Sequence, residues 1–438
     1  MSDSQPKIVI TGLGVISPLG NTLDEFRASL EQTRSGITEL GTPFEHLPTS
    51  VAGRASGFTG DIEQFGEMEK TLKRSIKKGL KLMCREIQMG VAAAQLATND
   101  AGLLPEGEAA SAVNRERIGV LFGCDYILSI PEEFTSGVRS CLNEEGNFQF
   151  DRWAEQGLPK VDPLWLLKYL PNMPACHFAI YHDLRGPNNS LTVREASSNL
   201  AITEALNTLQ RGSADAIVVG GTGCRIHTSR SVHISLQEQI SAGQGPAAEA
   251  CRPFDAHRDG MVLGEGAGAL IMETESNAAA RGAKPLATVL AGASSTVADT
   301  RGVANYRQAF ENVIRRVLDE SGMQASDIGH VNAHGLATGT CDQQEAEAIQ
   351  AVLSDQIPVF APKSYMGNLG AGSGMVESIA SILCLQQGQL YPTLNCVNKD
   401  AACPINVITG TGTSAGDNFI NLNVTPQGQA SAVLIAKA

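Results

Sequence analysis

The chain has 438 residues, 42% of them apolar, and a formal net charge of −13. This length is too great for one ordinary core, so we expect two domains or two fused halves. The acidic balance leaves no domain-wide basic field to neutralise phosphates, so nucleic acid is not an expected partner.

Strand and helix patterns alternate along the first 275 residues. Buried strands are predicted at Lys7–Ile16, Ile118–Phe122, Asn189–Val193, Ala216–Val219 and Ala267–Glu273. Helices are predicted at Thr22–Leu30 and Ser197–Leu209. Residues 124–180 interrupt the alternation, and we interpret them as an inserted cap.

The pattern restarts after Ser276–Gly282, a stretch rich in Ala and Gly that we interpret as a hinge. The strands predicted next are Leu286–Ala291, Ile328–Ala333 and Val359–Pro362, and the helices are Tyr306–Ser321, Asp342–Leu353 and Val376–Gln386. Two successive series predict an α/β fold with a duplicated mixed sheet covered on both faces. The N-terminal half would span residues 1–275 and the C-terminal half residues 276–438.

Nothing in the composition predicts a secreted, membrane or disulfide-bonded protein. The polar N-terminus lacks a basic-then-apolar signal segment, and no apolar run approaches the ~20 residues that span a membrane. The ten cysteines include no C-x-x-C pair and no Cys/His cluster at zinc spacing. We therefore expect free thiols, no metal site and a cytoplasmic location.

Two glycine-rich segments have some features of phosphate-binding loops. Gly12–Gly14 follows a strand, but the third glycine and the acidic ribose ligand of a dinucleotide loop are not in place. Gly264–Gly268 precedes a strand rather than a helix, so no helix N-terminus is available to hold a phosphate. A tight backbone turn is the better interpretation of the second segment.

Five longer segments agree in order and spacing with one family. They are VITGLGVISPLGN at Val9–Asn21, PNMPACHFAIYHDLRGP at Pro171–Pro187, RPFDAHRDGMVLGEGAGAL at Arg252–Leu270, VNAHGLATGTCDQQEAEAI at Val331–Ile349 and PKSYMGNLGAGSGMVES at Pro362–Ser378. Together they resemble the β-ketoacyl-acyl-carrier-protein synthases over nearly the whole chain. The resemblance implies a thiolase-like, duplicated αβαβα layered fold with two pseudo-equivalent halves.

The resemblance also implies a site, with departures from the family pattern. Counted from Arg185–Pro187, the family's nucleophilic cysteine at the start of a buried helix falls on Glu195, which cannot form a thioester. His334 and Lys363 match the family's first histidine and its lysine, whereas the second histidine is replaced by Asn368. In the family, the two histidines polarise the malonyl thioester carbonyl and stabilise the enolate.

Two further segments bear on this site. Asp342 and Glu345 match an acidic pair that often lies near the family's lysine. The family's glycine loop falls near Val424–Ala430, which keeps one glycine and neither aromatic residue. The changes at Glu195, at Asn368 and in this loop argue against Claisen condensation. The alternative for Glu195 is a solvent-facing acid at a helix start.

One basic cluster stands out from the acidic background. It consists of Lys70, Lys73, Arg74, Lys77, Lys78, Lys81 and Arg85, with Leu72, Ile76, Leu80 and Met83 between them. This spacing predicts an amphipathic helix with a cationic face. The face is either simply solvated or a docking surface for an acidic acyl-carrier protein. The resemblance favours docking, because the corresponding segment of the family is also basic.

The resemblance leads to three hypotheses of function. The first is a non-condensing homologue similar to the chain-length factors, which pair with an active ketosynthase, shape the chain tunnel and have glutamine for cysteine. The second is an enzyme in which Glu195, His334 and Lys363 decarboxylate a malonyl group, hydrolyse a thioester or transfer an acyl group. The third is a structural dimer partner without a tunnel. No cofactor is expected beyond the phosphopantetheine-linked acyl substrate on its carrier protein.

The register of these motifs makes three structural predictions. Asn189–Val193 should pair antiparallel with its mate in a homodimer, or with an active ketosynthase in a heterodimer. Glu195, His334, Lys363 and Asn368 should converge on one buried pocket. The ionised Glu195 should raise the pKa of His334 and keep that histidine cationic near neutral pH.

Overall fold

The computed structural model describes residues 5–42, 44–45, 47–105 and 113–438. Their strands form one mixed sheet in the order β11-β10-β9-β12-β13-β8-β1-β7-β6-β4-β5, and the β2–β3 hairpin joins it along β7. The strands are β1 (Ile8–Ile16), β2 (Ile37–Glu39), β3 (Val51–Gly53), β4 (Ile118–Cys124), β5 (Asn188–Thr192), β6 (Ala216–Cys224), β7 (Leu263–Thr274), β8 (Ala287–Thr296), β9 (His330–Asn332), β10 (Pro358–Phe360), β11 (Asn406–Val407), β12 (Asn418–Val424) and β13 (Gln429–Lys437).

The sheet is a duplication. The five main strands of the first half, β1, β4, β5, β6 and β7, lie in the order β1-β7-β6-β4-β5, and those of the second half lie in the order β8-β13-β12-β9-β10. In both halves the spatial order is first, fifth, fourth, second and third along the chain. The first two neighbour pairs are antiparallel and the last two are parallel. The predicted α/β fold with two equivalent sheet units is therefore confirmed.

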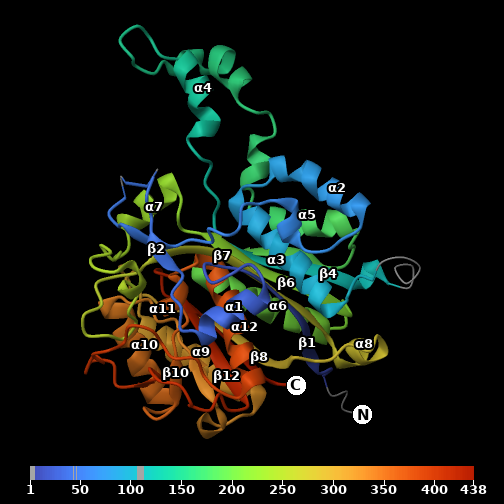
Figure 1. Cartoon of the computed structure of the whole chain (residues 1–438), viewed down its shortest axis with the longest axis vertical. Coiled ribbons are helices and arrows are strands. Elements are labelled where there is room, and N and C mark those ends of the chain that lie inside the picture. The colour runs from blue at the N-terminus through green and yellow to red at the C-terminus, as the bar shows by residue number, and fades with distance from the viewer. Residues whose placement is uncertain (1–4, 43, 46, 106–112) are drawn as a thin grey trace.

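Helices form layers around and between the two units (Figure 1). The central layer is α6 (Ser197–Gln210) with α12 (Ser373–Gln387), which contact each other and strands of both units. The first unit is covered on its outer face by α3 (Arg85–Ala101) and α5 (Met173–His182), and the second unit by α9 (Tyr306–Ser321) and α10 (Gly339–Val352). The remaining helices are α1 (Leu23–Glu31), α2 (Lys70–Gly79), α4 (Glu132–Ser140), α7 (Thr228–Ser235), α8 (Glu275–Ala280) and α11 (Lys363–Met366).

Two sequence-based predictions about local structure are wrong. Gly264–Gly268 is not a turn but part of β7, and a Cβ atom on Gly264 would lie 2.7 Å from the carbonyl oxygen of Met366. The glycines therefore allow the backbone of α11 to approach the strand closely. The expected hinge at Ser276–Gly282 is mostly the short helix α8, which begins where the Thr274 side chain accepts a hydrogen bond from the Asn277 amide.

The predicted insertion lies between β4 and β5, and much of it projects from the body as an arm that carries α4 (Figure 1). None of residues 124–180 lines the cavity that reaches Glu195. We call residues 126–170 the arm. Its exposed large apolar side chains are Ile130, Val138, Leu142, Phe148, Phe150, Leu158, Leu164 and Leu166.

Two properties of the described residues bear on the expectations from composition. Among their helices, none combines the length and apolar character that a membrane crossing requires. All ten cysteines are free thiols.

Candidate active site

Of the four site residues predicted from the sequence, Glu195 and Asn368 lie at corresponding places in the two halves, each before a central helix. Glu195 belongs to the 3-10 turn Arg194–Ala196, directly before the central helix α6. Asn368 lies shortly before the other central helix, α12, while His334 follows β9 and Lys363 begins α11. Each of the four is only 1% exposed. The solvent-facing alternative for Glu195 is therefore wrong.

The structure brings these four side chains together in two contacts. The Asn368 Nδ2 atom donates to Glu195 Oε1 at 3.2 Å, across 173 positions of sequence. The Lys363 Nζ atom lies 3.3 Å from His334 Nδ1. Glu195 and His334 line the same cavity. The predicted convergence on one pocket is present only in part, because Lys363 and Asn368 contact these two side chains but do not line the cavity.

Glu195 is held in a cluster of four alternating charges. Arg225, whose side chain is fully buried, donates through Nη1 to Glu195 Oε1. It also donates through Nη2 to Glu238 Oε1 at 2.6 Å. Arg194 donates to the same Glu238 oxygen, and its Nε atom lies 3.7 Å from Glu195 Oε2. We call Arg194, Glu195, Arg225 and Glu238 the carboxylate lock.

The backbone at Arg194 fits this cluster. Arg194 has φ of +49°, in the left-handed region, which costs a non-glycine residue about 1 kcal/mol or more. This conformation lies between β5 and α6. The Arg194 side chain there pairs with Glu238, and the Glu195 side chain pairs with Arg225. The ion pairs offset the cost of the turn.

The pKa of Glu195 is set by two opposing effects. Burial raises it, but the charges of Arg225 and Arg194 lower it by more, to about 2. The side chain is therefore a carboxylate throughout the neutral range. A carboxylate of such low pKa is a weak base and a weak nucleophile.

A second charged cluster surrounds Lys363. Its Nζ atom donates to Glu377 at 2.5 Å, and the other Glu377 oxygen accepts from Asn423 at 2.9 Å. The Asn423 Oδ1 atom lies 3.2 Å from His334 Nδ1. A neutral imidazole carries one ring proton, so Nδ1 either donates to Asn423 or accepts from Lys363. We call Lys363, Glu377, Asn423 and His334 the lysine cluster.

The acidic pair expected beside Lys363 has a different role. Glu345 accepts hydrogen bonds from the backbone amides of His334 at 2.6 Å and Gly335 at 2.9 Å. Asp342 accepts from the backbone amide of Phe254 at 2.9 Å. Neither carboxyl group forms an ion pair with Lys363, whose partner is Glu377. Asp342 and Glu345 therefore fix the loop that carries His334.

The prediction that His334 is cationic is wrong. Burial and the neighbouring Lys363 charge lower its pKa well below the ordinary value, and the attraction of Glu195 does not compensate. The negative charge of Glu195 is already paired with Arg225. His334 is thus neutral near pH 7.

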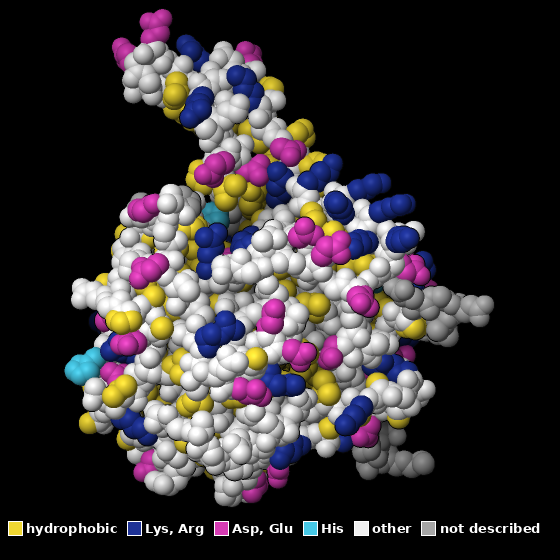
Figure 2. Space-filling model, viewed as in Figure 1, with side chains coloured by type: hydrophobic (Ala, Val, Ile, Leu, Met, Phe, Trp, Pro, Cys, Tyr) yellow, Lys and Arg dark blue, Asp and Glu magenta, His cyan; other side chains and the backbone are white. Residues whose placement is uncertain are grey.

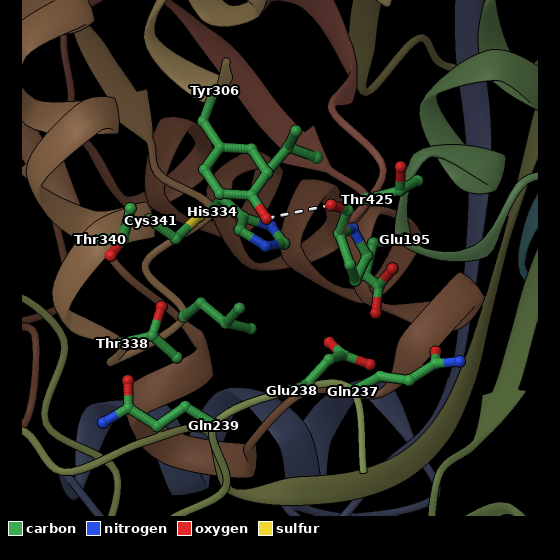
Figure 3. A pocket seen from close by; sticks show the side chains of 13 residues that line it. Glu195, Gln237, Glu238, Gln239, Tyr306, His334, Thr338, Thr340, Cys341 and Thr425 are labelled. Atoms are coloured by element: carbon green, nitrogen blue, oxygen red, sulfur yellow. Dashed lines mark hydrogen bonds between the residues drawn. The ribbon is translucent and has the colours of Figure 1, made fainter. Parts of the chain in front are cut away.

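The cavity that reaches Glu195 has a volume of about 220 Å³. In Figure 3, Glu195, Glu238 and Gln237 lie on one side of it and Thr338, Thr340 and Cys341 on the other. The turn between β12 and β13 contributes Val424, Thr425 and Pro426, and the Tyr306 hydroxyl anchors this turn by donating to the Pro426 carbonyl at 3.1 Å.

Two fully buried arginines that follow β6 are each paired with a carboxylate. Arg225 and Arg230 are among the largest fully buried side chains. Arg230 donates to Glu86 at 2.5 Å, while Arg225 holds Glu195. Both guanidinium groups are committed to buried carboxylates.

Sequence reasoning missed five residues of these clusters: Arg194, Arg225, Glu238, Glu377 and Asn423. Arg225 directly follows the buried strand β6, and a cation at the end of an apolar run was an available signal. Glu377 lies within the Pro362–Ser378 segment. Only the fold reveals its pairing, because α12 places it beside Lys363.

The predicted basic helix is present as α2 with the turn that follows it. Lys70, Arg74, Lys77, Lys78 and Lys81 are exposed, and Figure 2 shows a group of dark blue side chains over α2. Lys73 pairs with Glu63 at 2.5 Å.

Arg85 does not belong to this face, because it begins α3 and pairs with the buried Glu265 at 2.7 Å. We call Lys70, Lys73, Arg74, Lys77, Lys78 and Lys81 the cationic face.

Comparison with family models agrees with the fold and the site. Residues 5–278 match the N-terminal domain of β-ketoacyl synthases, and residues 286–397 match the C-terminal domain. The chain belongs to the β-ketoacyl synthase family.

Individual relatives cover nearly the whole chain. The chain is 30% identical over 409 residues to 3-oxoacyl-acyl-carrier-protein synthase 2 of Synechocystis sp. The aligned part covers 92% of this chain and 91% of the relative.

Two solved structures have the same fold. One is the ishigamide ketosynthase/chain length factor, with 23% identity, a TM-score of 0.83, and coverage of 99% of this chain and 100% of that one. The other is a type II PKS acyl-carrier protein in complex with its ketosynthase, with 21% identity, a TM-score of 0.80 and the same coverage.

Proposed function

We propose that this chain is a non-condensing ketosynthase homologue that acts as the chain-length-factor-like partner of an active ketosynthase in fatty acid or polyketide synthesis. The observation that carries the proposal is the buried ion pair of Glu195 with Arg225. It stands at the position that the family motifs assign to the nucleophile.

The lock opposes condensation in two ways. A thioester intermediate needs a thiolate, whereas Glu195 offers a carboxylate whose Oε1 atom already accepts from Arg225 and Asn368. Both N–H groups of Asn368 Nδ2 already have acceptors, because this atom donates to Glu195 Oε1 and also lies 3.0 Å from Met261 Sδ. The amide that replaces the family's second histidine is therefore not presented to a thioester oxygen.

Partnership is supported by an open sheet edge and by the arm. Among the described strands, β5 pairs with β4 alone and ends the sheet path, so its outer side is available to another strand. The arm follows β4 and places exposed apolar side chains outside the body, including Phe150 at 78% exposure. Exposed apolar surface of this kind is typical of protein–protein contacts. A related fold, the ishigamide ketosynthase/chain length factor, is such a pair by its name.

Carrier-protein docking is the proposed role of the cationic face. Its six basic side chains lie on a chain whose net charge is −13, so they form a local positive patch. An acidic carrier protein would be attracted there. A ketosynthase of the same fold is known in complex with its acyl-carrier protein.

One observation favours the second candidate, an enzyme acting on carrier-bound thioesters. The cavity reaches both Glu195 and His334. The Lys363 ammonium group lies 3.3 Å from His334 Nδ1. Decarboxylation of a malonyl group would then depend on His334 and Lys363, since Glu195 is a poor base at a pKa of about 2.

The isolated protein, incubated with malonyl-carrier protein and octanoyl-carrier protein, separates these candidates. We expect no β-ketoacyl product, no released carbon dioxide and no free octanoate. Release of carbon dioxide that is lost in His334→Ala would establish the second candidate instead. Formation of a β-ketoacyl product would overturn the proposal.

A further inference from the structure

The cavity that reaches Glu195 is lined by negative charge. Its lining includes two carboxylates, Glu195 and Glu238, and no Lys or Arg side chain from the described part of the chain. Burial and the nearby Lys363 charge lower the pKa of His334, so the imidazole in the lining is neutral. Because a cleft lined by one sign of charge attracts the opposite sign, this lining disfavours an anionic ligand.

Each of the two carboxylates uses one oxygen for the carboxylate lock. Glu195 Oε1 accepts from Arg225 and Asn368, whereas Oε2 is buried and has no hydrogen-bond partner among the described residues. Arg194 Nε lies 3.7 Å from this Oε2 atom, which is beyond hydrogen-bonding distance. Both arginines bind Oε1 of Glu238, and they balance the two negative charges from outside the cavity lining. Since buried polar atoms normally have a partner, Glu195 Oε2 requires a donor that a ligand can supply.

Two glutamines add neutral acceptors to the same lining. The side-chain nitrogen of Gln239 donates to the Asp259 carbonyl at 3.0 Å, and that of Gln237 donates to His233 Nε2 at 2.9 Å. Neither Asp259 nor His233 lines the cavity, so the glutamine oxygens remain available to a ligand. In Figure 3, Gln237, Glu238 and Gln239 follow one another along the edge of the cavity.

A protonated primary amine has the charge and the donors that this lining requires. It carries one positive charge and three N–H donors, and hydrogen bonds from such a group to a carboxylate are among the strong ones. The cavity volume of about 220 Å³ lies below the range of about 300–1,000 Å³ that is usual for drug-sized ligands, so the bound group must be short.

We propose that this cavity binds the ammonium end of a short aminoacyl group carried on pantetheine, with the nitrogen at Glu195 Oε2 and Glu238, and rejects the carboxylate of a malonyl group. The proposal rests on the proposed function in taking a carrier-bound acyl group as the occupant. It adds the charge that this group must carry.

Three amides of aminopantetheine, in which nitrogen replaces the thiol sulfur, test the proposal. The β-alanyl and butanoyl amides have the same length and differ by an ammonium group in place of a methyl group, whereas the malonyl amide ends in a carboxylate. Each is titrated calorimetrically into the full-length protein at pH 7. We expect the β-alanyl amide to bind at least about tenfold more tightly than the butanoyl amide, and the malonyl amide to bind most weakly.

Substitutions in the lining locate the binding site. Glu238→Gln keeps the size of the side chain but removes one charge, and should reduce the preference for β-alanyl over butanoyl about threefold or more. Thr340→Lys adds a cation at an exposed lining residue outside the lock, and should lower the ratio of β-alanyl to malonyl affinity at least about tenfold. Thr340→Met, of similar length but uncharged, is the matched control and should keep the wild-type ranking.

The ranking of the three amides decides the proposal. Equal affinity of the wild-type protein for the β-alanyl and butanoyl amides, tighter binding of the malonyl amide, or no binding of the β-alanyl amide would each overturn it. Equal affinity ratios in Thr340→Lys and Thr340→Met would also overturn it. The amides do not undergo thioester chemistry, so a β-ketoacyl product formed from thioesters would overturn the proposed function and leave this ranking unchanged.

Discussion

The two halves of the chain contribute two charged clusters to one site. The clusters differ in whether the side chain that lines the cavity is free of an ion pair. The lysine cluster, from the second half, keeps the neutral His334 at the cavity beside Lys363. The carboxylate lock, from the first half, pairs every charge with another and ties Glu195 to Arg225.

The difference bears on the proposed function. The second half places a neutral imidazole at the cavity, whereas the first half places a closed ion-pair network there. Since a buried carboxylate without its cation would be costly, Glu195 and Arg225 depend on each other. The lock is therefore a network of interdependent charges.

Breaking the lock should produce the largest effect. Arg225→Met leaves the buried Glu195 and Glu238 with Arg194 as the one remaining cation of the lock and should lower the free energy of unfolding by about 3–5 kcal/mol. Adding Glu195→Gln should recover part of this loss, because the uncompensated charge is removed. Denaturant unfolding of the single and double variants measures both effects.

The control for this cycle is Arg301→Met, which removes an exposed ion pair with Asp299 and should change stability by less than about 0.5 kcal/mol. If Arg225→Met also changed the free energy of unfolding by less than about 0.5 kcal/mol, the buried ion pair would not contribute as proposed.

A pH titration sharpens the comparison. The pKa of Glu195 falls from 4.5 to about 2 on folding, so its stabilisation is complete above pH 4.5 and is lost as the pH falls toward 2. The loss over that window should be on the order of 3 kcal/mol. Glu195→Gln should therefore show a flatter stability profile below pH 4.5 than wild type, measured by denaturant unfolding at each pH.

Glu320→Gln, on the exposed surface of α9, is the control and should follow the wild-type profile. Identical slopes for wild type and Glu195→Gln would mean that Glu195 titrates normally.

The open edge of the sheet allows a test of dimerisation. The Val120 amide donates to the Pro187 carbonyl, and alternate residues of a parallel strand face its neighbour, so the Ser190 amide points away from β4. Its partner is the adjacent Asn189 side chain, at 2.8 Å. Ser190→Pro should therefore convert a dimer to a monomer in sedimentation at micromolar concentration.

Ser190→Ala keeps the amide and should remain dimeric. A wild-type monomer would leave only the heterodimer with an active ketosynthase, and a dimer that survives Ser190→Pro would place the interface elsewhere.

The cationic face should give the smallest effect. Lys77→Glu with Lys78→Glu reverses two exposed charges and should weaken carrier-protein binding about tenfold at low salt, and less at high salt. Arg315→Glu with Arg316→Glu on α9 makes the same charge change elsewhere and should have little effect. If both double variants weakened carrier-protein binding equally, the attraction would come from net charge alone and not from the cationic face.

The sequence was most informative where periodicity and motif register coincide. The bounds of α9 agree with the predicted helix, and the register of the family motifs placed Glu195 and Asn368 in contact across the two halves. The β7 glycines were misread because their role is a close approach of α11, which no local pattern encodes.

The electrostatics of the site also depend on contacts distant in sequence. Treating Glu195 and His334 as neighbours predicted a cationic histidine, whereas Arg225 takes up the Glu195 charge and Lys363 opposes protonation of His334. Arg225 lies 30 positions from Glu195 and Lys363 lies 29 positions from His334, so contacts distant in the sequence affect the pKa of both groups.

The intact mass of the protein after incubation with octanoyl- and malonyl-carrier protein tests the central claim most directly. We expect no octanoyl adduct on the wild-type chain, and no condensation product from it or from Glu195→Cys. The single variant should fail because Asn368 and the Val424–Ala430 turn remain, so that restoration also requires Asn368→His and an aromatic, glycine-rich loop. An octanoyl adduct with a β-ketoacyl product from the wild-type chain, or robust condensation by Glu195→Cys alone, would contradict the account.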